Sequence, residues 1–324
     1  MRSQITDILA PVEINENAIP VVAWAALSAR ATGSHLTLLH VNEALEPIKS
    51  SRAFFTKDNP ETTAMIEEWR NAATEMARLE LAQLAERFCA EVAVDTILLE
   101  GHARKTVLAH LEHTPADLVV VGTHGKPWYH QPLLGSTAET ILRLLSHPVL
   151  IVHNAAPGQR RPRLHHLLCA TDLSKDSLAA EEWTRFWAAH GVEEITLLHI
   201  VENPLLEVYE PDKVELAPRQ PSEKSRPSTP HPTQRFWEHA HHAAQAKLSN
   251  LQQQFQAVSM QVELVIRDGP AAEAILNVAR EKTVDLIIMG THGRASRRRM
   301  LIGKETERVV SAASCPVLVV PNRP

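Results

Sequence analysis

Two glycine-rich stretches of the chain have the residue types and spacing to bind a phosphate. The first runs from Gly122-Thr-His-Gly125, through nine further residues, to Gly135-Ser136. The second runs from Gly290-Thr-His-Gly293, again through nine residues, to Gly303-Lys304. Glycine lets the backbone turn tightly and approach a ligand closely. In each stretch the last glycine opens a predicted helix, whose free N–H groups and partial positive charge attract phosphate.

The side chains that follow these glycines differ between the two stretches. Ser136, with Thr137 beside it, offers a hydroxyl donor, whereas Lys304 offers a positive point charge. Glycines at the end of a strand and the start of a helix are also ordinary turn residues. The two stretches alone therefore leave a purely structural role open.

The chain is an internal duplication, which places the two stretches in equivalent contexts. LTLLHVN at 36–42 recurs as TLLHIVEN at 196–203, and ADLVVVGTHGK at 116–126 recurs as VDLIIMGTHGR at 284–294. HPVLIV at 147–152 recurs as CPVLVV at 315–320. A segment with Pro157, Gly158 and Pro162 separates the copies. We predict two domains, at residues 1–155 and 164–324.

Strands and helices alternate along each copy. In the first copy we expect strands near 5–12, 35–41, 93–99, 117–122 and 149–152, and helices near 17–31, 65–79, 102–113 and 136–146. In the second we expect strands near 167–171, 195–201, 261–266, 285–290 and 317–320, and helices near 175–190, 236–255, 271–282 and 304–313. Continuous apolar strands such as LVVV and LIIM are typical of a parallel sheet covered on both faces. The pattern predicts two tandem, doubly wound, Rossmann-like α/β domains.

The long helix of each copy carries apolar residues at helical spacing, which predicts one apolar stripe on each. The stripes are Met65, Trp69, Ala72, Met76 and Leu79 in the first copy, and Phe236, Ala240, Ala244, Leu248, Leu251 and Phe255 in the second. Segment 203–234, just before the second of these helices, contains seven prolines. That density blocks helix and central strand, so we expect an exposed, mobile loop there.

Composition excludes several classes of function. The chain has 33 basic against 38 acidic residues, for a net charge of −5, which argues against bulk electrostatic binding of nucleic acid. No run approaches the 18 apolar residues of a membrane span, and the first twenty residues lack a signal-peptide core. The three cysteines, Cys89, Cys169 and Cys315, cannot form a disulfide framework and indicate a reducing compartment. We expect a cytoplasmic protein with neither a nucleic-acid nor a membrane partner.

The pattern G-x2-G-x9-G-[S/T], followed by a helix and PVLVV, resembles the nucleotide-binding signature of the universal stress protein family. The resemblance covers nearly the whole chain as two tandem copies. It implies a five-stranded parallel sheet of order 3-2-1-4-5 in each copy. In the ATP-binding members of that family, an Asp after the first strand and a Val at the end of the second lie near the adenine and ribose. The glycine loop holds the phosphates. The implied ligand is ATP or another adenine nucleotide, with Mg²⁺ as a possible companion.

The first copy matches this signature with two departures. The matching residues are Pro11, Val41, Gly122, Gly125, Gly135, Ser136 and Thr137. Glu13 stands where the family usually has Asp, so the carboxylate reaches with one more methylene. The loop contains Pro127, Trp128 and Pro132 in place of small residues, and each proline removes a backbone donor. The aromatic side chains there could cover a base or simply fill the site.

The second copy departs from the signature at other positions. It keeps Thr171, Asp172, Gly290, Gly293 and Gly303, and it has Ile200 at the end of its second strand. Lys304 replaces the hydroxyl residue, and could pair with a phosphate or turn into solvent. Arg294 opens an arginine-rich stretch that could clamp a phosphate or form a solvated face. We expect at least one copy to bind nucleotide, and the sequence leaves open which one.

In the universal stress protein family, single domains pair through their last strands. Here both last strands, 149–152 and 317–320, belong to one chain, and unpaired apolar edges promote aggregation. We therefore predict that the two domains pair with each other as a pseudo-dimer. A further homodimer of the whole chain stays open.

The leading hypothesis is a tandem stress-response or signalling protein that binds ATP and is not an enzyme. The sequence has no Walker loop, no G-x-S-x-G elbow and no HExxH pair, and no metal site is predicted. One alternative is a nucleotide-free interaction module of the same fold with decayed sites. Another is a weak ATPase with slow hydrolysis or autophosphorylation.

Overall fold

The computed structural model describes residues 4–15, 17–43, 60–123, 135–144, 147–153, 162–201, 232–255, 260–291 and 302–321. Residues 203–231 of the proline-rich segment lie outside this range, as do Gly125, Gly293 and Arg294. The last residues of that segment already belong to a helix, which begins at Pro232. Proline is well tolerated at the first helical position, where its missing N–H is not needed.

The first repeat alternates strands and helices as predicted. Its elements are β1 (Asp7–Pro11), α1 (Ala18–Thr32), β2 (His35–Asn42), α3 (Pro60–Phe88), β3 (Val94–Glu100), α4 (Ala103–His113), β4 (Leu118–Gly122), α5 (Ser136–Leu144) and β5 (Val149–Val152). The long helix α3 extends beyond the stretch in which the apolar spacing was recognised. Gly33 ends α1 in the left-handed conformation, with φ of 69°, which glycine adopts without steric cost.

The second repeat has the same order of elements, preceded at its first helix by a short 3-10 turn. They are β6 (His166–Ala170), η1 (Lys175–Ser177), α6 (Leu178–Ala188), β7 (Glu194–Val201), α7 (Pro232–Gln253), β8 (Gln261–Asp268), α8 (Ala271–Glu281), β9 (Leu286–Gly290), α9 (Lys304–Ala312) and β10 (Val317–Val320). None of the helices in the described ranges is both long and apolar enough to cross a membrane.

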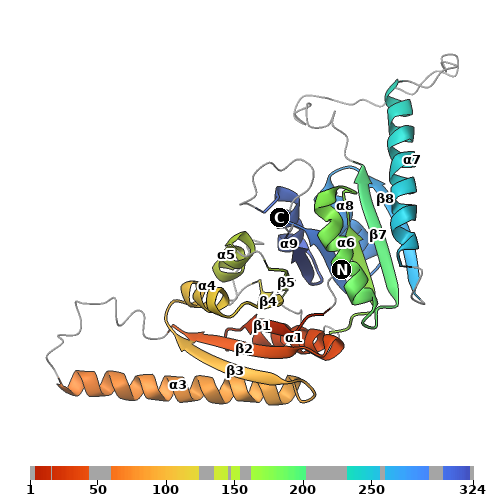
Figure 1. The fold of residues 1–324 in the computed structure, drawn as a ribbon. Helices are drawn as coiled ribbons and strands as arrows, with labels where there is room; N and C mark the ends of the chain where they lie inside the picture. Colours follow the sequence, from red (N-terminus) through yellow and green to blue (C-terminus); the bar gives the residue numbers. More distant parts are fainter. Residues whose placement is uncertain are drawn as a thin grey trace, which may run out of the picture.

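All strands join one ten-stranded sheet of order β3-β2-β1-β4-β5-β10-β9-β6-β7-β8 (Figure 1). Within each repeat the strands are parallel and follow the order 3-2-1-4-5. The two repeats meet where β5 and β10 pair antiparallel, with Leu150 opposite Leu318. The predicted pairing of the last strands into a pseudo-dimer is therefore present within the chain.

Helices cover both faces of the sheet and close one apolar core on each. The first core includes Trp24 of α1, Leu81 of α3, Trp187 of α6 and Leu248 of α7. The second includes Val107 of α4, Ile141 of α5, Ile275 of α8 and Val309 of α9. Each core draws residues from both repeats. The two halves are thus held together by shared cores as well as by strand pairing.

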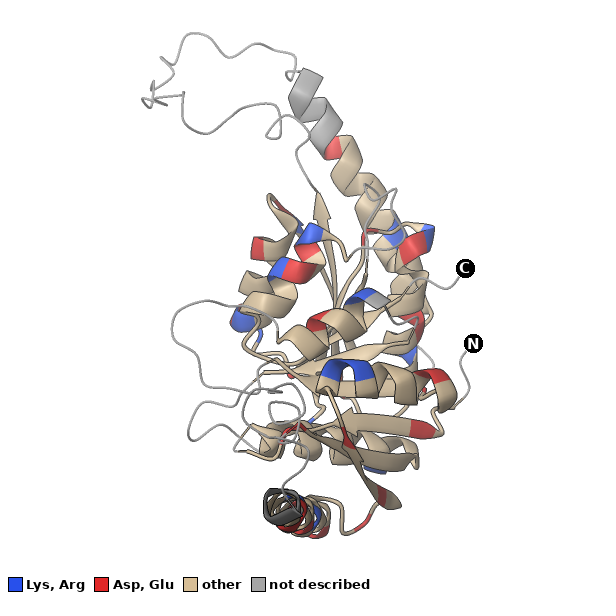
Figure 2. Ribbon diagram, turned by 90° about the vertical axis from the view of Figure 1, so that its left-hand side faces the viewer, with Lys and Arg blue, Asp and Glu red and all other residues tan. Residues whose placement is uncertain are grey.

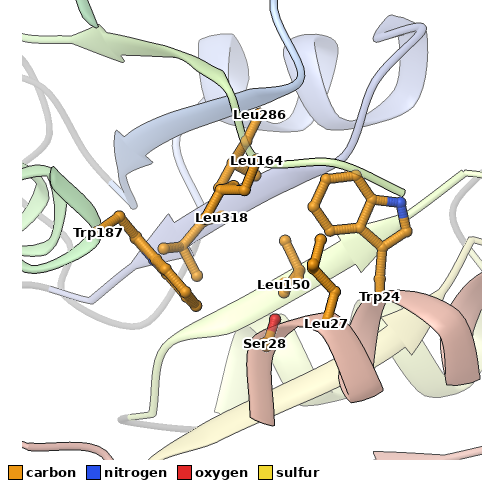
Figure 3. A pocket seen from close by; sticks show the side chains of 8 residues that line it. All are labelled: Trp24, Leu27, Ser28, Leu150, Leu164, Trp187, Leu286 and Leu318. Atoms are coloured by element: carbon orange, nitrogen blue, oxygen red, sulfur yellow. The ribbon is translucent and has the colours of Figure 1, made fainter. Parts of the chain in front are cut away.

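Side chains from both repeats face each other across the junction in the first core (Figure 3). They line a narrow apolar gap. Its lining residues are Trp24, Leu27, Ser28, Leu150, Leu164, Trp187, Leu286 and Leu318. The indole Nε1 of Trp187 is buried and has no hydrogen-bond partner in the described part of the chain. The gap is a packing feature of the junction, and its walls are almost wholly hydrocarbon.

The predicted apolar stripe faces the core on α7 and faces solvent on α3. The side chain of Phe236 lies outside the described part of the chain. Ala244, Leu248, Leu251 and Phe255 of the second repeat are buried. In α3 the side chains of Met65, Trp69, Met76 and Leu79 are instead 71%, 46%, 63% and 61% exposed. The residues by which α3 packs on the core are Leu81, Leu84, Ala85 and Phe88. The helix therefore has two apolar surfaces, and the sequence pattern identified the outer one.

Burial raises the pKa of all three thiols, to about 11 for Cys89 and to about 12 for Cys169 and Cys315. Because the thiolate is the reactive form, we expect Ellman's reagent at pH 8 to label the native chain far more slowly than the unfolded chain. Unfolding in guanidinium should release three thiols per chain. Labelling of the native protein at the unfolded rate would show that these cysteines are not packed as described.

Candidate functional site

A cleft opens at the carboxyl ends of β1, β2 and β4, the switch point of the first half of the sheet. It encloses about 680 Å³, counting the space that is open to solvent. Its lining residues are Pro11, Val12, Glu13, Asn15, Asn17, Ala18, Val21, Leu39, His40, Val41, Glu43, Ala103, Val107, Val121, Gly122, Thr137 and Ala138. Ligands of doubly wound sheets bind in this position.

Five of the residues predicted from the first repeat lie together in this cleft: Pro11, Glu13, Val41, Gly122 and Thr137. Gly135 and Ser136 lie directly beside it, at the start of α5, although they do not line it. Gly125 is outside the described residues. The cleft thus brings together the ends of β1, β2 and β4 with the first turn of α5.

Gly122 lies where β4 passes close to α1. A Cβ atom added at this position would lie 3.1 Å from Cγ2 of Val21, and both residues line the cleft. A side chain here would make a tight contact and would need Val21 to shift by a few tenths of an ångström. At the other end of the glycine stretch, the amide of Gly135 donates to the carbonyl oxygen of Thr123 at 2.5 Å. This bond sets the start of α5 against the end of β4.

The end of β1 turns into α1 through a polar segment that leaves one carboxylate exposed. The amide of Val12 donates to the carbonyl of Leu39 at 2.8 Å and so extends the pairing of β1 with β2. Oδ1 of Asn15 accepts the amide of Asn17 at 2.8 Å, which is the local turn that Asn favours before a helix. Glu13 is exposed at the mouth, where Nδ2 of Asn15 approaches Oε2 at 3.4 Å. Its carboxylate can accept hydrogen bonds from a ligand.

His40 is a cleft residue that the motif comparison missed. Its Nδ1 donates to the carbonyl oxygen of Val12 at 2.9 Å, and His199 makes the same bond to Thr171 at 2.8 Å in the second repeat. The imidazole therefore ties the end of β2 to the end of β1 in both halves. With the proton on Nδ1, the neutral ring keeps Nε2 as an acceptor. The signal was visible in the sequence, because this histidine stands at the same place in both copies of LLH.

Glu43, which also lines the cleft, is hydrogen-bonded to the start of α4. Its Oε1 accepts the amide of Ala103 at 2.6 Å and lies 3.4 Å from Nδ1 of His102. A carboxylate is favourable at a helix N-terminus. The remaining walls are mostly aliphatic, with Val12, Leu39 and Val107 buried. The cleft has an apolar interior, a polar mouth and a helix N-terminus on one side.

The corresponding edge of the second repeat is occupied by its own side chains. Thr171 Oγ1 is buried and makes 2.8 Å hydrogen bonds with Ser177 Oγ and with Glu181 Oε1. Oδ1 of Asp172 accepts both the amide of Ser174 at 3.0 Å and its hydroxyl at 2.6 Å. Asp172 therefore has its partner within the turn after β6, and Thr171 has its partners in the helical segments that follow.

The start of α9 differs from the start of α5 in charge. Gly303 donates to Thr291 at 2.9 Å, as Gly135 does to Thr123, so Glu305 stands at the place of Thr137. Oε2 of Glu305 accepts the amide of Ala272 at 2.8 Å, and its Oε1 lies 3.0 Å from Nη1 of Arg308. A carboxylate is thus fixed where the first repeat has a hydroxyl. Lys304 is exposed beside it.

Thr306, the residue after Glu305, forms further hydrogen bonds to the end of β9. The hydroxyl of Thr306 donates to the carbonyl oxygens of Gly290 at 3.1 Å and Thr291 at 3.3 Å. At the matched position the first repeat has Ala138, which lines the open cleft. Ile200 is the residue before the last in β7, which ends at Val201. The second repeat therefore has the same backbone arrangement at this edge, but its side chains are hydrogen-bonded to one another there and one of them, Glu305, is negatively charged.

Burial raises the pKa of Glu181, and the hydrogen bonds from Thr171 and Ser177 oppose that rise only in part. A carboxyl group with a raised pKa in the folded state binds its proton more tightly than in the unfolded chain. Its contribution to stability is present below the ordinary value of 4.5 and is lost as pH rises through the folded-state pKa. We therefore expect Glu181→Gln to flatten the fall in unfolding free energy between pH 5 and 7.5.

Urea unfolding at the two pH values measures this effect, since Gln keeps an oxygen for the hydroxyl of Thr171. Glu273→Gln, at an exposed position of α8, is the control and should leave the pH dependence as in the parent. An unchanged pH dependence in Glu181→Gln would contradict the raised pKa.

Neither half of the described chain gathers three or more His, Cys, Asp or Glu side chains as a metal site would.

Two doubly wound halves joined in one sheet define a tandem α/β protein, with a cleft at the switch point of its first half. The family model of the Universal stress protein family matches residues 5–153 and 163–321. The chain belongs to the universal stress protein family, as two tandem copies.

Known relatives agree with this assignment. A universal stress protein of Mycolicibacterium smegmatis is 26% identical over 321 residues, covering 98% of this chain and 97% of its own length. The crystal structure of a universal stress protein from Archaeoglobus fulgidus DSM 4304 superposes with a TM-score of 0.64 at 20% identity, covering 98% of this chain and 97% of that one. This likeness shows a shared fold. A universal stress protein described in complex with cAMP is 19% identical, with a TM-score of 0.33, and covers 47% of this chain and all of its own.

Proposed function

We propose that this chain is a cytoplasmic stress-response protein that binds an adenine nucleotide, ATP in the first instance, in the cleft of its first repeat. One observation carries the proposal. The cleft at the switch point gathers five residues that the family signature selects, Pro11, Glu13, Val41, Gly122 and Thr137, beside the N-terminus of α5. The signature and the cavity are independent, because the signature comes from residue types and the cavity from packing.

The proposed ligand fits the chemistry of the cleft from its interior to its mouth. Aliphatic side chains such as Val41 and Val107 can contact the faces of a purine. The exposed carboxylate of Glu13 can accept a hydrogen bond from a ribose hydroxyl, as the aspartate at this position does in ATP-binding members of the family. The missing side chain at Gly122 leaves room for backbone approach. The free amides of the first turn of α5, with the hydroxyls of Ser136 and Thr137, can receive phosphate oxygens.

We propose that the second repeat does not bind nucleotide. Thr171 is hydrogen-bonded to Glu181 of α6, Asp172 to Ser174 of its own turn, and Thr306 across the end of β9. The carboxylate of Glu305 stands at the helix start, where it would repel phosphate. This arrangement leaves the second repeat to complete the shared cores and the sheet.

We propose binding without appreciable turnover, so that the bound nucleotide acts as a signal. Glu43, one of the carboxylates in the cleft, is engaged by α4 and is poorly placed to activate a water molecule. A weak ATPase activity would have to use Glu13 or groups outside the described residues.

The test is mass spectrometry of small molecules released when the purified chain is denatured. We expect an adenine nucleotide at up to one equivalent per chain, or uptake of added ATP by protein stripped of ligand. If none co-purifies and stripped protein takes up none, the proposal fails and the nucleotide-free interaction module takes its place.

A further inference from the structure

The start of α4, beside the cleft, carries two cations. Arg104 and Lys105 are the second and third residues of this helix, and both side chains are exposed. The first turn has no acidic residue, and neither cation forms an ion pair within the described ranges. A positive charge is unfavourable at the N-terminal end of a helix, which itself carries a partial positive charge. The two cations therefore need an explanation other than the stability of α4.

The equivalent helix of the second repeat, α8, has no cation in its first turn. In each repeat the glycine before this helix donates its amide to the end of the neighbouring strand. The two helices can therefore be matched residue by residue from these glycines. Ala272 then stands at the place of Arg104, and Glu273 stands at the place of Lys105. The fold itself does not require a positive charge at either position.

In the second repeat a carboxylate occupies the corner between two helix starts. Ala272 is 3% exposed, and its amide donates to Oε2 of Glu305 at 2.8 Å. Glu305 is the second residue of α9. The second repeat thus supplies its own anion to the first turns of α8 and α9 together, where the partial charges of the helices favour it.

The matching corner of the first repeat has the opposite chemistry. Thr137 stands there at the place of Glu305, and Arg104 at the place of Ala272. Helices α4 and α5 lie side by side in Figure 1, and Figure 2 views the molecule from the side on which they lie. Because Ala272 is buried at the corner with α9, the side chain of Arg104 leaves α4 toward the start of α5. A cation and a hydroxyl thus replace an alanine and a carboxylate.

The charges that line the cleft show why a cation is needed at this corner. The lining that the structure describes includes Glu13 and Glu43 but neither Lys nor Arg. Glu43 follows β2 and lies 3.4 Å from Nδ1 of His102. It reaches α4 from the side of β2, whereas α5 packs against β5, at the other end of this half of the sheet. A polyphosphate at the start of α5 therefore meets the cation of Arg104 rather than the carboxylate of Glu43.

We propose that Arg104 binds the terminal phosphate of the nucleotide, in the place that the carboxylate of Glu305 occupies in the second repeat. This inference rests on the proposed function, because it concerns the ligand of the same cleft. A guanidinium can donate to two phosphate oxygens at once. A nucleoside or a nucleoside monophosphate leaves Arg104 without this partner. The cleft therefore prefers a nucleoside triphosphate to either of them.

Calorimetric titration of the full chain, stripped of ligand, with ATP, AMP and adenosine tests the proposal. The parent chain should bind ATP at least tenfold more tightly than AMP. Arg104→Ala introduces the residue of the second repeat. It should lower the affinity for ATP at least tenfold and leave the affinity for adenosine as in the parent, so that the preference for ATP is largely lost.

Lys105→Ala is the matched control, because it removes the same charge from the same turn of α4. Its counterpart Glu273 is exposed, whereas Ala272 is buried, so Lys105 points into solvent and not toward α5. This variant should bind ATP nearly as the parent does, since salt screens an exposed charge at a distance. Both variants should keep the melting temperature of the parent without ligand, since alanine is a good helix former.

The same titrations separate this inference from the proposed function. If the parent chain binds ATP and Arg104→Ala binds it no more weakly than Lys105→Ala does, the role of Arg104 is overturned and the nucleotide site stands. A parent chain that binds AMP as tightly as ATP also overturns the role of Arg104. A parent chain that binds none of the three ligands overturns the proposed function, and this inference with it.

Discussion

Thr137→Glu should remove nucleotide binding without weakening the fold. Thr137 lines the cleft in the first turn of α5, where a carboxylate would lie beside the phosphates. A negative charge at this end of a helix is itself favourable, by about 0.3–1 kcal/mol. We expect the affinity for ATP to fall at least tenfold, or about 1.4 kcal/mol. The melting temperature of the free protein should stay level or rise slightly. Calorimetric titration and thermal melts of stripped protein measure the two effects.

Glu305→Thr is the matched control, because it makes the opposite exchange at the equivalent position of the second repeat. It removes the acceptor of the Ala272 amide and should lower stability modestly while leaving the affinity for ATP as in the parent. If Thr137→Glu binds ATP like the parent, or if Glu305→Thr loses binding, the nucleotide does not lie in the first repeat.

Leu318→Ala should cause a large loss of stability, because it opens a cavity where the two repeats join. Leu318 is 1% exposed, stands opposite Leu150 across the β5–β10 pairing, and belongs to a core shared by both halves. Removing a buried leucine side chain costs about 2–5 kcal/mol. We expect the free energy of unfolding in urea to fall by that amount.

Leu178→Ala provides the comparison at an exposed leucine of the same chain. Its expected cost is within about 0.5 kcal/mol, as for surface substitutions in general. A cost for Leu318→Ala no greater than that of Leu178→Ala would mean that the two repeats do not pack together in solution as described.

The fold was largely predictable because the same order of strands and helices occurs in both copies of the repeat. Continuous apolar strands with helices between them predicted a doubly wound parallel sheet in each half, and the resemblance to the universal stress protein family implied the strand order and the pairing of the last strands. The outward stripe of α3 shows where pattern reasoning fails. A regular 4-3-4-3 spacing shows that one side of a helix is apolar, but it does not say whether that side faces the sheet. Leu81, Leu84 and Phe88 bind α3 to its own domain through a different surface.

The candidate site was predictable in the first repeat and less so in the second. Motif residues such as Glu13, Val41 and Gly122 meet in the cleft because they end adjacent parallel strands. The hydrogen bond between Thr171 and Glu181 joins the end of a strand to the following helix. The family motif does not include Glu181, so the sequence did not predict this bond or the burial of the Glu181 carboxyl group. Thr137 and Glu305 are seen to be equivalent only in the structure, where Gly135 and Gly303 make matching hydrogen bonds two residues before them.

The stoichiometry of ATP binding tests the central claim most directly. Chain stripped of ligand should bind one ATP in a calorimetric titration, and Thr137→Glu should bind ATP at least tenfold more weakly. Two equivalents per chain would show that the second repeat also binds, despite Glu305 and Thr306. No binding to the parent chain would contradict the assignment of the cleft as a nucleotide site.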